Sequence, residues 1–134
     1  MGEVLLVAVD GTQQSLHAVD YAVRIANTSG FTIELLNIQP KVNTHYAIKK
    51  IGKNKLQAYK KECAIEVLKL GRSRVKDGIN LSVRWRQGIV AQEICKEAME
   101  IGAIGIVIGA SKRSKIKGRL LGSTCYQVLE SAPC

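Results

Sequence analysis

Apolar residues along this sequence form short continuous runs that alternate with longer stretches of helical spacing. The continuous and alternating runs have the length of β-strands, and they predict strands at residues 3–9, 31–38, 79–86 and 103–108. Apolar residues three or four positions apart predict helices that follow each strand, from Thr12 to Gly30, over 54–76, over 90–101 and from 122 onward. The chain therefore reads β-α-β-α-β-α-β-α.

Strict alternation of strands and helices is typical of the α/β class. We expect a single domain over residues 1–134 with a doubly wound parallel sheet, right-handed crossovers and helices on both faces. The first strand is apolar throughout, as a strand covered on both faces would be. The third strand alternates, with Leu81, Val83 and Trp85 against Ser82, Arg84 and Arg86, which predicts an edge strand with one exposed side.

Two of the predicted helices have an apolar face that can be named in advance. In helix 54–76 this face carries Leu56, Tyr59, Cys63, Val67 and Leu70. In helix 90–101 it carries Ile94, Cys95, Ala98 and Ile101. Thr12 is expected to cap the first helix, and Gly30 to end it.

Ligands of parallel α/β sheets bind beyond the carboxyl ends of the strands, where the strand order reverses. Asp10-Gly11-Thr12 follows the first strand, and Gly109 follows the fourth. Glycine permits a sharp turn or the close approach of a ligand. If the first and fourth strands are neighbours, both turns border one crevice.

The segment after Gly109 is strongly basic. Residues 110–121 hold five lysines and arginines and no acidic residue, and Gly122-Ser123-Thr124 then opens a helix. A helix start offers unpaired N–H groups and the positive end of its dipole. This arrangement favours an anion site, most simply for phosphate. The alternative is that the cations only keep a surface loop soluble.

Composition narrows the class of protein. Apolar residues make up 46% and charged residues 23%, as in globular domains, and no apolar run is long enough to span a membrane. No secretory leader is visible, so a cytoplasmic protein is expected. The four cysteines form no CxxC pair, and neither histidine has metal-ligand spacing. Without a Walker sequence or a catalytic triad pattern, we expect no enzyme, or at most slow ATP hydrolysis.

The net charge of +9 is concentrated in two places. Residues 41–76 hold eleven lysines and arginines against two glutamates, and the loop 110–121 adds five cations. A basic surface of this kind attracts acidic proteins, acidic lipids or nucleic acid. Nucleic acid is the least favoured of these partners, because aromatic residues make up only 4% of the chain and no recognition motif is present.

Several motifs in this order resemble the universal stress protein family over nearly the whole chain. They are Val7 to Thr12, Leu35 to Ile38, Gly88 with Ala91 and Ile94, and Gly109 to Cys134 with its Ala-Pro-Cys end. The resemblance implies a Rossmann-like sheet of the adenine nucleotide alpha hydrolase type with strand order 3-2-1-4. It also implies a stress-response protein that binds ATP or a related adenine nucleotide, with Mg²⁺ as a possible companion.

The same resemblance implies which residues bind the nucleotide. The backbone around Ala8, Val9 and Ile38 would hold adenine, and Asp10 with the end of the fourth strand at Ile108 and Gly109 would approach the ribose. The phosphates would meet Ser111, Lys112, Gly122, Ser123 and Thr124. For Asp10, a purely turn-forming role is the alternative.

The sequence departs from the family pattern at two points. The nucleotide-binding branch has Gly, two residues, Gly, nine residues and Gly-Ser; here Lys112 replaces the second glycine. Lys112 either contacts a phosphate or closes the pocket, which leaves a basic interaction module for an acidic protein partner as the alternative function. The usual fifth strand is not expected after Cys134, and the family's homodimer depends on it.

Overall fold

A four-stranded parallel sheet organises the molecule, with the strand order β3-β2-β1-β4. The computed structural model describes residues 3–41 and 52–109. The elements in this part of the chain are β1 (Val4–Ala8), α1 (Gln13–Ser29), β2 (Thr32–Gln39), α3 (Lys53–Arg72), β3 (Leu81–Gln87), α4 (Val90–Ile101) and β4 (Gly105–Val107). The predicted α/β class and strand order are therefore confirmed, and β3 is an edge strand of the described sheet as expected. The fourth helix and the question of a fifth strand lie outside the described residues.

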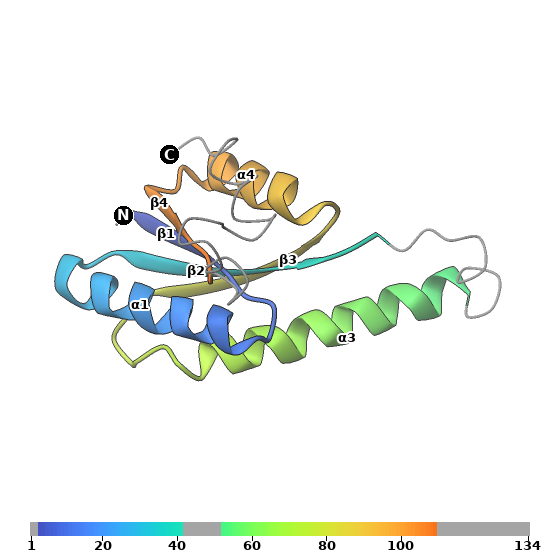
Figure 1. The fold of residues 1–134 in the computed structure, drawn as a ribbon, viewed down its shortest axis with the longest axis horizontal. Helices are drawn as coiled ribbons and strands as arrows, with labels where there is room; N and C mark the ends of the chain where they lie inside the picture. Colours follow the sequence, from blue (N-terminus) through green and yellow to red (C-terminus); the bar gives the residue numbers. More distant parts are fainter. Residues whose placement is uncertain (1–2, 42–51, 110–134) are drawn as a thin grey trace, which may run out of the picture.

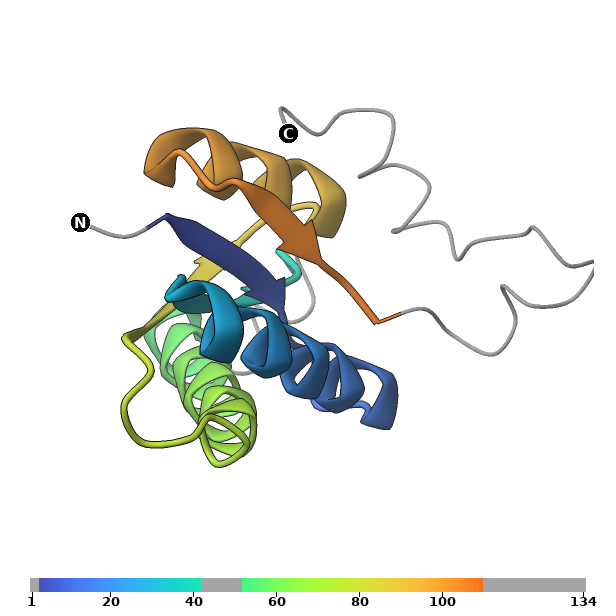
Figure 2. The same ribbon diagram turned by 90° about the vertical axis from the view of Figure 1, so that its left-hand side faces the viewer.

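The helices form a layer on each side of the sheet (Figures 1 and 2). α1 and α3 cover one face, and α4 covers the other. On the first face the core contains Val7, Val19 and Leu35, all fully buried. On the second face the core contains Leu6, Leu36 and Ile94, also fully buried. Neighbouring residues of β1 and β2 thus point to opposite cores, because side chains alternate across a strand.

The first helix begins and ends where the sequence predicts. Thr12 has an extended backbone, and its side chain accepts a hydrogen bond from the Ser15 N–H at 3.2 Å, which makes it the N-cap. Gly30 adopts a left-handed conformation with φ of 74°, and its N–H bonds to the Ala26 carbonyl. A left-handed residue of this kind is the common end of a helix and favours glycine.

The prediction for the face of α3 is only partly confirmed, because Val67 packs against the core as expected but other residues of that face do not. The helix buries Lys60, Ala64, Leu68 and Gly71, whereas Tyr59 and Leu70, expected on its apolar face, are exposed. Small residues explain why the helix turns this face toward the sheet, since a Cβ on Gly71 would lie 3.2 Å from Leu35 Cδ1. Alanine and glycine let the helix backbone come close to the sheet. The helix also ends at Arg72 rather than at residue 76.

The predicted exposed side of β3 is confirmed for Ser82 and Arg84 and is wrong for Arg86. Arg86 is only 17% exposed at its side chain, because α4 covers this side with glutamates. On the other side Val83, expected to be covered, is exposed, while Leu81 and Trp85 pack against the core below α3. In α4 the expected inward residues Ile94, Cys95 and Ala98 are buried, and Ile101 packs at their edge.

Candidate nucleotide site at the carboxyl edge of the sheet

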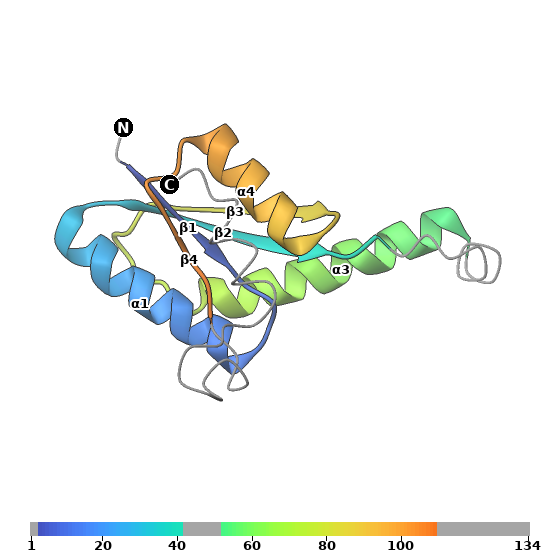
Figure 3. The same cartoon turned by 45° about the horizontal axis from the view of Figure 1, so that its top comes forward.

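β1 and β4 are neighbours and run in the same direction, so their carboxyl ends meet at one edge (Figures 2 and 3). Val7 pairs with Val107 in the register, just before both strands end. β1 also pairs with β2 on its other side. The strand order therefore reverses between β1 and β4, since the strand that follows β1 in the chain lies on the other side of it, and such a reversal is where parallel sheets bind ligands. The sequence predicts that the turns after these two strands border one crevice if the strands are neighbours, and the two strands are neighbours.

Three predicted site residues form a small apolar surface at this edge. Ala8, Ile38 and Ile108 come from three different strands, and all three are partly buried against the α4-side core. They lie at the carboxyl ends of β1, β2 and β4. A partly exposed aliphatic surface of this kind suits the flat face of an aromatic base.

Val9 directly follows β1, and hydrogen bonds fix both its backbone N–H and its backbone carbonyl. Its N–H donates to the Leu36 carbonyl at 2.9 Å, and its carbonyl accepts from Asn37 Nδ2 at 2.8 Å. The Asn37 side chain is buried, and its Oδ1 in turn accepts from Gln39 Nε2. A carbonyl oxygen has a second lone pair, so Val9 can still accept from a ligand. Its backbone position is fixed before any ligand arrives.

Asp10 lies exposed in the turn between β1 and α1. Its Oδ1 accepts from the Thr12 N–H at 2.9 Å and from Thr12 Oγ1 at 2.6 Å. Thr12 at the same time caps α1, and Ser15 Oγ accepts from the Asp10 N–H at 3.3 Å. The turn-forming role of Asp10 is therefore real. A carboxylate can accept about four hydrogen bonds, so the two from Thr12 leave capacity for a sugar hydroxyl.

Gly109 follows β4 and packs directly against the first turn of α1. A Cβ added to it would lie 2.3 Å from the Gln14 carbonyl oxygen and 2.7 Å from the Ser15 N–H nitrogen. Backbone atoms cannot move aside as a flexible side chain can. The sequence predicts that this glycine permits a sharp turn or the close approach of a ligand. The structure adds another reason for glycine here, because the backbone of α1 leaves no room for a Cβ. The contact fixes the end of β4 against the Asp10 turn.

The remaining predicted site residues, Ser111, Lys112, Gly122, Ser123 and Thr124, lie outside the described residues. Sequence reasoning did not assign a positioning role to Asn37 or Ser15, which hold Val9 and Asp10 in place. The signal for Asn37 was present, because it is the one amide in the apolar stretch 35–38.

The geometry is that of a parallel α/β domain in which the strand order reverses between β1 and β4. A model of the universal stress protein family matches residues 1–134, and the chain belongs to that family. It is 27% identical over 138 residues to the universal stress protein YxiE of Bacillus subtilis, covering 97% of this chain and 93% of that protein.

Solved structures agree on the fold. UspA of Lactobacillus plantarum is 23% identical, with a TM-score of 0.74 and coverage of 98% of this chain and 93% of that one. A universal stress protein of Archaeoglobus fulgidus in complex with dAMP is 19% identical, with a TM-score of 0.63 and coverage of 99% and 93%. A universal stress protein in complex with cAMP is 18% identical, with a TM-score of 0.64 and coverage of 98% and 90%.

Two further findings concern the described residues, one on metal-binding groups and one on membrane-spanning helices. Among residues 3–41 and 52–109, no group of three or more His, Cys, Asp or Glu side chains is placed to hold a metal ion. Within the same ranges, no helix is both long and apolar enough to cross a bilayer.

Proposed function

We propose that this protein binds an adenine nucleotide, ATP or a close relative, at the edge where β1 and β4 end, and that it acts in the cytoplasm as a regulatory module rather than as an enzyme. The observation that carries the proposal is the arrangement of this edge. Two adjacent parallel strands end there, an aliphatic surface lies beside them, and Asp10 is fixed in the turn between β1 and α1.

The ligands of two structural relatives support the choice of nucleotide. One relative holds dAMP and another holds cAMP. These ligands differ in the sugar hydroxyls and in the form of the phosphate. They share an adenine base, a pentose and one phosphorus. The base needs an apolar surface, and each sugar has one free hydroxyl, at the 3′ position in dAMP and at the 2′ position in cAMP, which needs an acceptor. The described edge offers both.

Each described residue has a separate part in this proposal. The adenine ring would lie on Ala8 and Ile38, beside the Val9 carbonyl, and Asp10 would accept from the ribose. Ile108 and Gly109 would bring the chain toward the phosphates, where the basic segment 110–121 and Gly122-Ser123-Thr124 would bind them. Mg²⁺, if it accompanies ATP, would be held chiefly by the phosphates, as is usual for this ion.

Calorimetric titration with ATP and Mg²⁺ tests the proposal. The natural protein is expected to bind in the micromolar range, and Asp10→Ala is expected to weaken binding roughly tenfold through loss of one hydrogen bond to a charged acceptor. Asp77→Ala is the matched control, because Asp77 lies in the turn before β3 at the opposite edge. The proposal fails if neither the natural protein nor either variant binds ATP, or if Asp10→Ala and Asp77→Ala weaken binding equally.

The substitution Lys112→Gly distinguishes the two alternatives for Lys112, which either contacts a phosphate or closes the pocket. If Lys112 contacts a phosphate, the glycine variant binds ATP more weakly and with a smaller dependence on salt. If Lys112 closes the pocket, only the glycine variant binds.

Regulation by nucleotide implies that the basic loop changes state on binding. We expect ATP to protect the loop 110–121 from trypsin, which cleaves after lysine and arginine. Unchanged cleavage in that loop at saturating ATP would contradict this mechanism.

A second candidate function is a basic interaction module that needs no nucleotide. α3 extends beyond the end of the sheet (Figure 1), and its first turns carry the exposed cations Lys53, Lys55 and Lys61. An acidic protein partner would fit this end. Binding to such a partner that survives removal of ATP, and that weakens steeply with salt, would favour this function.

A further inference from the structure

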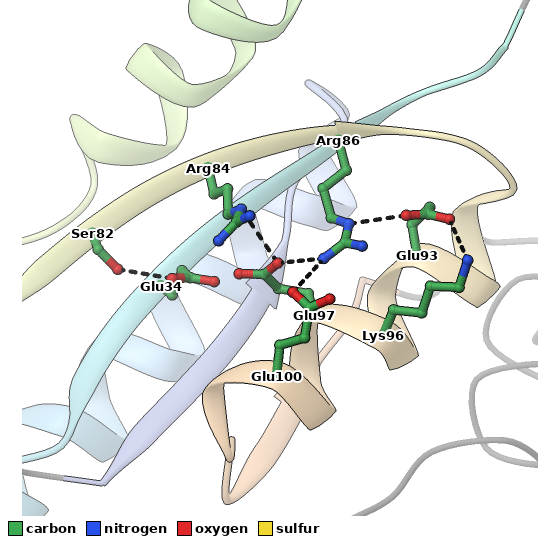
Figure 4. A network of polar contacts seen from close by, with 8 residues as sticks. All are labelled: Glu34, Ser82, Arg84, Arg86, Glu93, Lys96, Glu97 and Glu100. Carbon is green, nitrogen blue, oxygen red and sulfur yellow. Dashed lines mark hydrogen bonds and ion pairs between the residues drawn. The ribbon is translucent and has the colours of Figure 1, made fainter.

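The face of the sheet under α4 contains a buried ionic network (Figure 4). Glu97 of α4 is fully buried, and its Oε1 accepts from Arg86 Nη1 at 2.8 Å and lies 3.5 Å from Arg84 Nε. Arg86 also donates to Glu93 at 2.9 Å and to Glu100 at 3.0 Å. One arginine of an edge strand thus contacts three glutamates along one side of the helix.

Glu34 joins this network from the middle of β2. Its side chain is buried, and its Oε1 accepts from Ser82 Oγ at 3.2 Å. Figure 4 shows the carboxyl groups of Glu34 and Glu97 pointing toward one another from β2 and α4. Oε2 of each is buried and has no hydrogen-bond partner among the described residues.

Two facing, buried carboxylate oxygens are unfavourable when both groups are ionised. An ionised carboxylate only accepts hydrogen bonds, so neither oxygen can satisfy the other, and the two negative charges repel. A single proton removes both problems, because it forms an O–H···O⁻ bond from one carboxyl to the other.

The charges around the pair agree with one bound proton. Glu97 and Arg84 face Glu34 directly, and the network that they belong to holds three cations and three further acids from β3 and α4: Arg84, Arg86, Lys96, Glu93, Glu97 and Glu100. On β1 the register partner of Glu34 is Leu6, which is apolar. Together with Glu34, four carboxyl groups stand against three cations. One proton makes the network neutral.

The proton belongs mainly to Glu34. Two guanidinium groups lie against the Glu97 carboxylate, whereas the hydrogen bond from β3 to Glu34 comes from the neutral hydroxyl of Ser82. Burial, and then the neighbouring Glu97, raise the pKa of Glu34 from 4.5 to about 7. Burial opposes ionisation of Glu97, yet the bonds from Glu34 and Arg86 outweigh it and hold the pKa of Glu97 below its ordinary value.

We propose that Glu34 and Glu97 share one proton below neutral pH, and that this proton is a pH-sensitive latch between β2 and α4. Loss of the proton leaves two carboxylates facing each other in a buried interface, and the packing of α4 on the sheet weakens. This proposal does not depend on nucleotide binding.

The direction of the pH effect follows from the raised pKa of Glu34. The folded state holds this proton more tightly than the unfolded chain does, so the contribution to stability is complete below about pH 4.5 and is lost as the pH rises through about 7. Over this window the unfolding constant is expected to rise by roughly 10²-fold from this group alone.

Glu34→Gln tests the latch. The amide has the shape of the protonated acid and donates permanently to Glu97 Oε2. We expect the ratio of the unfolding constants of natural protein and variant, measured in urea, to increase roughly 10²-fold between pH 5 and pH 8.5. Glu62→Gln is the control, because Glu62 is an exposed acid of α3, which lies on the opposite face of the sheet from this network, and its ratio should stay constant. A constant ratio for Glu34→Gln would overturn the proposal.

A second measurement does not depend on any variant. The side-chain carboxyl ¹³C signal of Glu34 in the natural protein is expected to titrate near neutral pH, and amide exchange in α4, corrected for its intrinsic pH dependence, should accelerate relative to α1 over the same range. A Glu34 signal that titrates at the ordinary pH of a glutamate would contradict the shared proton. A titration near neutral pH without a change in α4 would contradict the latch.

Discussion

The two faces of the sheet are stabilised in different ways. Under α1 and α3 the core is mainly apolar, with Val7, Val19 and Leu35 fully buried, and Lys60 is the buried charged residue of these two helices. Under α4 the core is apolar only beside β1, at Leu6, Leu36 and Ile94. Toward β3 the same face changes to charged residues, where Arg86 contacts three glutamates.

This difference shows what each kind of contact contributes. Apolar burial is non-directional and depends on the area removed from water. Ion pairs between guanidinium and carboxylate groups are directional and fix one register. On the apolar face, α3 packs against the sheet through its small residues. On the other face, ion pairs between glutamates of α4 and arginines of β3 help to fix the position of α4. Both faces meet at the carboxyl edge, where Val9 belongs to one core and Ile38 to the other.

The largest expected effect is the loss of Arg86. Arg86→Ala would leave the Glu97 carboxylate fully buried, with Arg84 at 3.5 Å as its remaining ion-pair partner. Breaking a buried pair in this way costs about 3–5 kcal/mol of unfolding free energy. Arg74→Ala is the control, because the pair of Arg74 with Asp20 is more than a third exposed on both sides, and its loss should cost at most about 1 kcal/mol. Equal losses in urea unfolding would contradict the importance of the network.

The next effect compares the two cores directly. Leu35 and Leu36 are neighbours in β2, both fully buried, and they point to opposite faces. Each substitution by alanine is expected to cost about 2–5 kcal/mol, from lost burial and the cavity left behind. Chemical unfolding of the two variants measures this. A much smaller loss for Leu36→Ala would mean that ionic contacts alone hold α4.

The smallest of the three effects concerns the end of β4. Gly109→Ala forces a Cβ into the backbone of α1 and is expected to cost about 1–3 kcal/mol, with a lower melting temperature. Gly105→Ala, in the same strand, meets only Leu5 Cδ2 at an ordinary 3.5 Å and should change stability by less than about 1 kcal/mol. If both variants melt alike, the contact between Gly109 and α1 does not fix the strand end.

Much of the fold could be predicted because strand and helix periods are local properties. The four strands, the Thr12 cap and the Gly30 stop agree with the structure, and so does the order 3-2-1-4, which the family resemblance implies rather than any local period. The face of α3 could not be predicted, because a search for large apolar residues selects Tyr59 and Leu70 and overlooks Ala64 and Gly71. Small residues bury little surface themselves, yet they determine how closely a helix approaches.

The network under α4 was missed for a related reason. Alternation in β3 correctly separated Arg84 and Arg86 from Trp85, but it cannot tell whether solvent or glutamates cover the charged side. At the candidate site, the family resemblance implies Ala8, Ile38 and Ile108, and in the structure these three residues lie at the carboxyl ends of β1, β2 and β4. It did not assign Asn37 to Val9 or Gly109 to the backbone of α1, because these contacts join segments far apart in the chain.

The most direct test of the central claim is a titration with ATP and Mg²⁺ followed by the amide signals of an ¹⁵N-labelled sample. The account predicts that the largest shifts among the described residues fall at Val9, Asp10, Ile38, Ile108 and Gly109, where β1, β2 and β4 end. Shifts confined to the amino-terminal turns of α3 or to the opposite edge of the sheet, or no shifts at saturating ATP, would contradict it.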